Sequence, residues 1–63
     1  MQERVKTLRE AANLTQKEAA RKLGVVQSAV SMWETGESKP KTEILPRIAA
    51  VYGCSISELF ASE

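Results

Sequence analysis

Apolar residues recur along the chain at helical spacing, in short segments separated by residues that cap or break helices. The apolar positions of the first segment are Met1, Val5, Leu8 and Ala12. Positions three or four apart lie on one face of a helix, so this spacing predicts an amphipathic helix over about residues 2–12. No segment alternates with a period of two for long enough to predict a strand.

A second helix is predicted to begin after Thr15. Thr15 and Glu18 have the spacing of a capping box, in which the threonine hydroxyl accepts from the backbone N–H of Glu18 and the carboxylate accepts from that of Thr15. This helix is expected to end at Leu23, because Gly24 readily takes the left-handed conformation that follows a helix.

A third helix is predicted over about residues 27–35, with Gly36 at its end. Its core-facing positions are Ala29, Val30 and Trp33. The turn at Gly24 is so short that the second and third helices cannot lie antiparallel and must cross steeply. This crossing predicts a helix-turn-helix at about residues 15–35.

The outer face of the predicted third helix carries no charged residue. It consists of Gln27, Ser28, Ser31 and Met32. A face that serves only solubility would normally carry charged side chains, so this composition indicates a binding function. The amide of Gln27 has the donor and the acceptor needed to read an adenine edge through two hydrogen bonds.

Two more helices are predicted in the last third of the chain. Thr42 is expected to cap the fourth, whose start should be slightly irregular because Pro46 lies in its first turn. Gly53 should end it, and the capping box of Ser55 and Glu58 should open a last short helix that runs through Phe60. The chain is therefore predicted to be all-α, with five short helices.

Composition narrows the function. A length of 63 residues allows one domain, expected to span residues 1–63. With no histidine and Cys54 as the single cysteine, a disulfide framework is excluded, and we expect no metal, cofactor or small-molecule ligand and no enzyme activity. The net charge of +1 excludes a strongly cationic arm. Without an apolar run of the ~20 residues that span a membrane, or a secretion signal, the expected location is cytoplasmic.

Several short segments, taken together, form one characteristic pattern along the chain. They are Leu14-Thr15-Gln16-Lys17-Glu18, Gly24-Val25, Gln27-Ser28-Ala29-Val30-Ser31, Trp33-Glu34-Thr35-Gly36, Lys39-Pro40, Ile48-Ala49, Tyr52-Gly53-Cys54-Ser55-Ile56 and Glu58-Leu59. The pattern covers nearly the whole chain. It resembles the phage-repressor and Cro-type helix-turn-helix family, which includes xenobiotic-response-element-like regulators. The resemblance implies a compact, five-helix, lambda-repressor-like DNA-binding domain whose third helix enters the major groove, usually as a dimer on a palindromic operator.

The resemblance also implies roles for individual residues. Base-contacting positions of the family fall on Gln27, Ser28 and Met32. Phosphate-contacting positions fall on Thr15, Gln16, Lys17, Ser31, Lys39 and Lys41, although Lys17 equally fits the solvated face of the second helix. By the same resemblance, the side-chain amide of Gln16 can also buttress the first base-contacting residue. Arg9 and Glu34 stand where the family has an internal ion pair that fixes the angle of the reading helix.

Val26 departs from the family, which usually places Ser or Thr there as the N-cap of the third helix. Losing such a cap costs about 0.5–2 kcal/mol. The alternative is that Val26 is itself a base contact, with a methyl surface that meets the C5 methyl group of a thymine.

We expect a sequence-specific regulator of transcription that binds double-stranded DNA, acts as a repressor and forms a homodimer. Three large apolar residues lie near the end of the chain, Ile56, Leu59 and Phe60. Those of them that do not fit into the small core would form the dimer surface. The alternative is a protein-interaction module on the same scaffold, such as the antitoxin of a toxin–antitoxin pair, which the nearly neutral charge favours.

Overall fold

The computed structural model describes residues 2–60, and this part of the chain forms five α-helices and one 3₁₀ turn, with no strand. The elements are α1 (Gln2–Ala11), α2 (Gln16–Leu23), α3 (Gln27–Thr35), η1 (Thr42–Ile44), α4 (Leu45–Tyr52) and α5 (Ile56–Phe60). The predicted all-α fold of five helices is confirmed. Met1 and the side chain of Phe60, both predicted to be apolar positions of helices, lie outside what is described.

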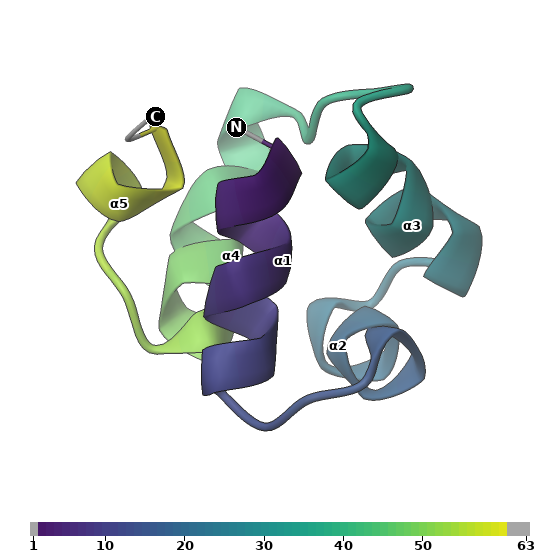
Figure 1. Ribbon diagram of the computed structural model, residues 1–63, viewed down its shortest axis with the longest axis horizontal. Coiled ribbons are helices and arrows are strands. Elements are labelled where there is room, and N and C mark those ends of the chain that lie inside the picture. The colour runs from purple at the N-terminus through teal and green to yellow at the C-terminus, as the bar shows by residue number, and fades with distance from the viewer. Residues whose placement is uncertain (1, 61–63) are drawn as a thin grey trace.

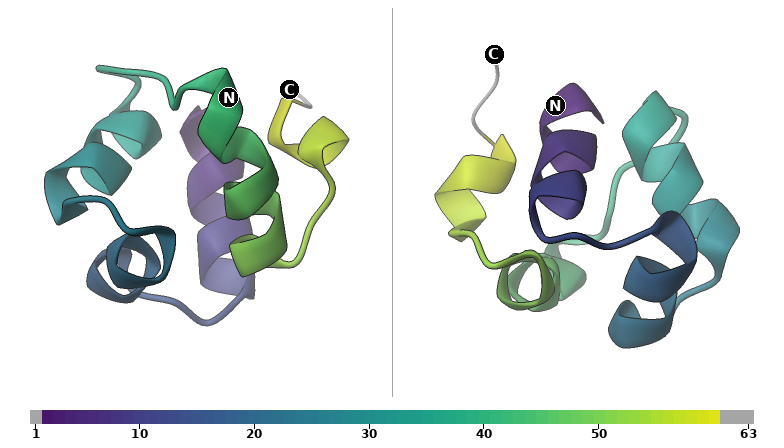
Figure 2. Two further views of the ribbon diagram at one scale, coloured as in Figure 1. Left: turned by 180° about the vertical axis from the view of Figure 1, so that it is seen from behind. Right: turned by 60° about the horizontal axis from the view of Figure 1, so that its bottom comes forward.

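Helices α1 and α4 pack together in the middle of the molecule (Figure 1). Helices α2 and α3 lie on one side of this pair, where α3 contacts α1 and α2 contacts α4. Helix α5 packs against α1 and α4 on the other side, as the views in Figure 2 also show. The last helix therefore lies away from the predicted helix-turn-helix.

The core contains side chains from all five helices. Its buried apolar members are Val5, Ala19, Ala20, Leu23, Val30, Trp33, Leu45, Ile48, Ala49, Tyr52 and Leu59. Trp33 is only 7% exposed, which confirms its predicted place in the core. Cys54 is half-buried and packs against the core, and burial raises the pKa of its thiol, so this cysteine is a small filler side chain.

Local sequence signals determine where α2 and α5 begin. Thr15 Oγ1 accepts from the backbone N–H of Glu18 at 3.0 Å, and the Glu18 carboxylate accepts from the backbone N–H of Thr15 at 2.9 Å. This backbone hydrogen bond lowers the pKa of Glu18. The same pair of bonds joins Ser55 and Glu58, at 3.1 and 2.8 Å. Both predicted capping boxes are confirmed.

The start of the fourth helix differs from the prediction. Thr42 is not an N-cap but the first residue of η1, and α4 begins only at Leu45. The reason is Pro46, which has no N–H to donate to the Thr42 carbonyl in an α-helical turn. That carbonyl accepts instead from the backbone N–H of Leu45, one residue earlier, which gives a 3₁₀ turn.

The end of α1 also differs slightly, since the helix stops at Ala11 rather than at residue 12. Asn13 takes a left-handed conformation with φ of 61°, and Leu14 donates its backbone N–H to the Arg9 carbonyl at 3.3 Å. This arrangement turns the chain toward α2. None of the helices in the described part of the chain is long and apolar enough to cross a membrane.

Candidate nucleic-acid interface

A three-residue connection joins α2 to α3 and sets their steep crossing. Gly24 is left-handed with φ of 75°, and its N–H bonds the carbonyls of Ala20 and Arg21. Val25 then donates to the Ala20 carbonyl at 3.0 Å, and Val26 is extended. In Figure 1, α2 is seen nearly end-on while α3 runs obliquely across the view. The two helices thus form a helix-turn-helix.

The outer face of α3 begins with exposed side chains and becomes less accessible along the helix. Gln27 and Ser28 are exposed, whereas Ser31 and Met32 are half-buried. The opposite face is fixed in the core through Val30 and Trp33. The positions that the resemblance assigns to base contact therefore lie on the solvent side of a helix whose opposite side is buried in the core.

Val26 stands at the start of this face. It is 68% exposed, and as the N-cap residue of α3 it makes no side-chain hydrogen bond to the helix. Valine has no polar side-chain atom that could cap the first turn of α3, so this helix lacks the stabilisation that a serine or threonine would give. Its place beside Gln27 gives the tip of α3 one apolar and one amide surface.

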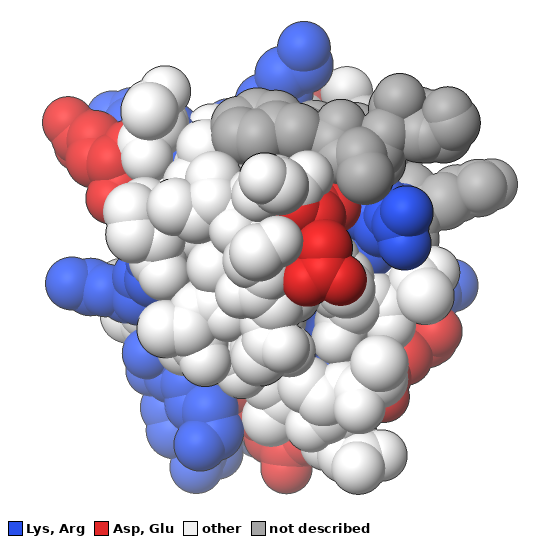
Figure 3. All heavy atoms as spheres, turned by 90° about the vertical axis from the view of Figure 1, so that its left-hand side faces the viewer, with Lys and Arg blue, Asp and Glu red and all other residues white. Residues whose placement is uncertain are grey.

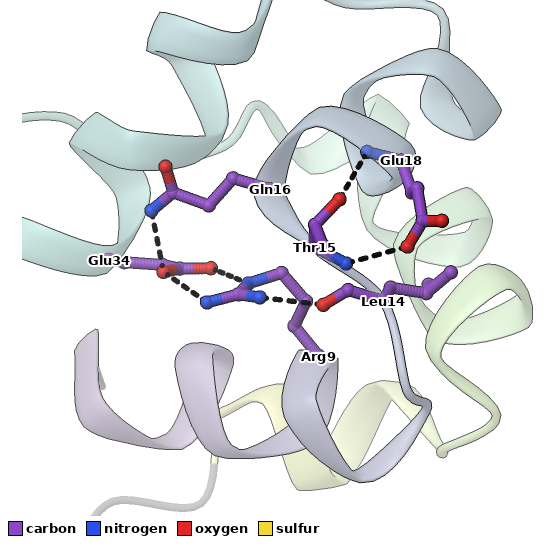
Figure 4. Close-up of polar contacts among 6 residues, drawn as sticks. All are labelled: Arg9, Leu14, Thr15, Gln16, Glu18 and Glu34. Atoms are coloured by element: carbon purple, nitrogen blue, oxygen red, sulfur yellow. Dashed lines mark hydrogen bonds and ion pairs between the residues drawn. The ribbon is translucent and has the colours of Figure 1, made fainter.

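A buried ion pair links α1 to α3 (Figure 4). Arg9 Nε donates to Glu34 Oε2 at 2.6 Å and Arg9 Nη2 donates to Glu34 Oε1 at 3.2 Å, so the two residues that the resemblance pairs are in contact. Arg9 Nη1 donates to the Leu14 carbonyl at 2.6 Å. The hydrogen bond to Glu34 raises the pKa of Arg9, so the guanidinium stays charged.

Gln16 takes part in the same network. Its Nε2 donates to Glu34 Oε1 at 3.0 Å, from the first residue of α2. The resemblance assigns Gln16 to a phosphate contact, and the structure shows that one of its amide hydrogens already bonds a carboxylate. Sequence reasoning missed this partner, because the two residues are 18 positions apart and no local pattern joins them.

The basic residues predicted to contact phosphate are exposed. Lys17 lies in the first turn of α2, and Lys39 and Lys41 lie in the loop between α3 and η1. Sequence reasoning also missed Arg47, whose Nη1 donates to the Leu23 carbonyl at 3.3 Å. A cation at the end of α2 is favoured by the helix dipole, and here it links α4 to the turn of the helix-turn-helix.

The sequence matches the Helix-turn-helix family over residues 5–59. The chain belongs to this family. It is 38% identical over 61 residues to the HTH-type transcriptional activator BcrR of Enterococcus faecalis, covering 97% of this chain but only 30% of BcrR. It is 33% identical over 63 residues to an HTH-type transcriptional regulator of Methanocaldococcus jannaschii, covering 96% of that protein. A regulator of Archaeoglobus fulgidus is 32% identical over 60 residues and is covered to 84%.

No solved structure matches the chain. The family membership and the geometry of α2 and α3 agree: this is the helix-turn-helix DNA-binding domain of a transcriptional regulator. Because the chain spans less than a third of BcrR, it corresponds to one part of that longer protein and to most of the two archaeal ones.

Proposed function

We propose that the protein binds double-stranded DNA sequence-specifically by placing α3 in the major groove, and that it acts as a homodimeric repressor on a palindromic operator. The observation that carries this proposal is the face formed by Val26, Gln27 and Ser28. These side chains are exposed and uncharged, and they project from a helix that the core and an ion pair hold in a fixed orientation.

Base reading follows from the chemistry of this face. Gln27 has the amide geometry that bonds the N6 and N7 atoms of adenine, and Ser28 can donate to or accept from a neighbouring base. Val26 and the half-buried Met32 offer apolar surface to thymine methyl groups. The preferred half-site would therefore include A·T pairs near the start of α3.

Phosphate binding would come from two places that flank α3. The backbone N–H groups of Thr15 and Glu18 already donate within the capping box. The backbone N–H groups of Gln16 and Lys17 can therefore point at a phosphate from the positive end of α2. Ser31, Lys39 and Lys41 would contact the backbone on the other side. Because only Lys17, Lys39 and Lys41 would supply cationic contacts in each subunit, affinity should depend only weakly on salt, since each neutralised phosphate contributes a slope of about 0.9.

A second copy of the chain would associate through the side of the molecule that carries α5. Of the three apolar residues predicted for this surface, Leu59 is buried, whereas Ile56 is 40% exposed. Figure 3 looks onto this side, where uncharged side chains occupy much of the face, one acidic side chain lies near its centre and most of the other charged ones lie toward the rim. Sedimentation of the protein with and without DNA tests the dimer, and a monomer at high concentration in both would contradict it.

The decisive experiment is selection from a random duplex pool at near-physiological salt. A retained site with two-fold symmetry and half-sites about one helical turn apart supports both base reading and the DNA-bound dimer. A reporter gene placed behind that site would then show lower expression when the protein is present, and higher expression would contradict repression.

An unselected pool would contradict the proposed function and favour the alternative of a protein-interaction module, such as an antitoxin. The observation that favours this alternative is the same largely uncharged side around α5, together with a net charge of only +1.

A further inference from the structure

Gln16 joins the two helices of the helix-turn-helix at the ends that the chain does not connect. The turn at residues 24–26 links the end of α2 to the start of α3. Gln16 is the first residue of α2 and Glu34 is the last but one of α3, so the 3.0 Å bond between them lies at the far ends of both helices. The turn and this bond together hold the crossing angle at two points.

The Glu34 carboxylate receives donors from two different helices, as Figure 4 shows. Oε2 accepts from Arg9 of α1, and Oε1 accepts from both Arg9 and Gln16. Arg9 also bonds the Leu14 carbonyl, just before α2 begins. The charge of Glu34 is already balanced by Arg9. The side-chain amide of Gln16 therefore gives the carboxylate a further hydrogen bond without leaving an unpaired charge.

The Gln16 side chain is half-buried, and its amide oxygen points away from Glu34 in Figure 4. An oxygen cannot donate to a phosphate, so only the second amide hydrogen is left for the contact that the resemblance implies. The start of α3 has no side-chain cap at Val26. Its orientation therefore depends on its buried face and on what holds Glu34.

We propose that Gln16 is a positioning residue, which sets the angle of α3 against α2 and thereby the base specificity of the domain. This inference rests on the proposed function, in which α3 reads bases. The amide of Gln16 acts on specificity through Glu34, and a contact between its side chain and phosphate is not its main contribution.

The test compares Gln16→Leu, which removes the donor, with Lys17→Ala, which removes a cation from the neighbouring exposed position. Affinity is measured for the selected duplex, for its single-base-pair variants and for an unrelated duplex. Circular dichroism first establishes a temperature at which each variant is folded. We expect Gln16→Leu to reduce the ratio of specific to unrelated affinity by about tenfold, because a shifted α3 loses aligned base contacts.

Lys17→Ala should weaken all duplexes alike and leave that ratio unchanged. If Gln16→Leu also weakens all duplexes alike, Gln16 is a phosphate contact and the proposal is wrong. If it lowers only thermal stability, with the ratio intact, Gln16 is a structural residue without a positioning role, and the proposal is again wrong.

A measurement without DNA separates this proposal from the proposed function. Residual dipolar couplings of backbone amides report the angle between α2 and α3 in the free protein. We expect this angle to change in Gln16→Leu while the angle between α1 and α4 stays the same. An unchanged angle would overturn the proposal, whatever the binding data show. A changed angle in a protein that selects no site would support the positioning role in the fold and contradict DNA reading instead.

Discussion

Arg9 and Glu34, which are 25 positions apart, face each other across the contact between α1 and α3 with two hydrogen bonds of 2.6 and 3.2 Å. The exposed fractions of their side chains are only 9% and 4%. Removing two charges from water is expensive, and the attraction between them repays this only while both are present. The pair as a whole therefore contributes little to the free energy of unfolding. Loss of either residue, however, would leave the other as a buried charge without a partner.

Removing one partner should be far more damaging than removing both. Arg9→Met or Glu34→Leu alone should reduce the free energy of unfolding by about 3–5 kcal/mol. A domain of this size has a total of only about 3–9 kcal/mol, so a large fraction of either variant should be unfolded at room temperature. The double variant should be more stable than either single one. Urea titration followed by the fluorescence of Trp33, the single tryptophan, measures this, and single losses below 1 kcal/mol would contradict it.

Val26→Ser should change stability and DNA affinity in opposite directions. A serine at this N-cap supplies the missing hydrogen bond to the start of α3 and should raise the free energy of unfolding by about 0.5–2 kcal/mol. Affinity for the selected duplex should fall, because the methyl contacts of Val26 are lost. Replacing the thymine with deoxyuridine should weaken binding of the natural chain and leave Val26→Ser unaffected. Equal sensitivity of both proteins would show that Val26 does not meet a methyl group.

The helix boundaries that the sequence predicted correctly are those set by interactions within four residues. The side chains of Thr15 and Glu18 each bond the other residue's backbone N–H, and Gly24 ends α2 through bonds to the preceding turn, so both signals can be identified in the local sequence. The fourth helix was mispredicted because two local signals compete there. Thr42 favours a cap, but Pro46 removes the donor that an α-helical turn from Thr42 would need.

The candidate site was predictable as far as it depends on helical periodicity. The exposed positions of Gln27 and Ser28 follow from the buried positions of Val30 and Trp33 on the same helix. The partners of Gln16 and Arg47 were not predictable, because they are 18 and 24 positions away and depend on how the helices pack. Family resemblance supplied the pair of Arg9 and Glu34, which periodicity alone does not indicate.

Gln27→Ala should weaken binding to the preferred site by about 1–3 kcal/mol and relax the preference at one base pair. The reason is that the amide makes its bonds to one adenine edge and the exposed side chain has no such partner on other sequences. Lys39→Ala is the matched control, since it should weaken all duplexes alike and reduce the salt slope by about 1. A uniform loss in Gln27→Ala would assign this residue to the phosphate backbone.

Tyr52 has a buried hydroxyl with no hydrogen-bond partner among the described residues, and the residue is only 4% exposed. An unpaired buried hydroxyl loses its hydration without compensation, at a cost of about 1–3 kcal/mol. Tyr52→Phe keeps the ring in the core and removes this penalty. The variant should therefore be at least as stable as the natural chain at pH 7 in urea unfolding. A clear loss of stability would show that the hydroxyl is bonded in solution.

Because of the same hydroxyl, the free energy of unfolding should fall as the pH rises above about 10. Burial raises the pKa of Tyr52 to about 12, whereas a tyrosine in the unfolded chain has a pKa of about 10. Between these values the unfolded state releases the proton and the folded state keeps it, so stability falls as pH rises, by up to about 1.4 kcal/mol per pH unit. Tyr52→Phe lacks this contribution. Between pH 9 and pH 11 the free energy of unfolding should therefore fall by about 1.4 kcal/mol more in the natural chain than in the variant, because all other titratable groups are common to both. An equal fall in the two proteins would mean that the Tyr52 hydroxyl reaches water in the folded state.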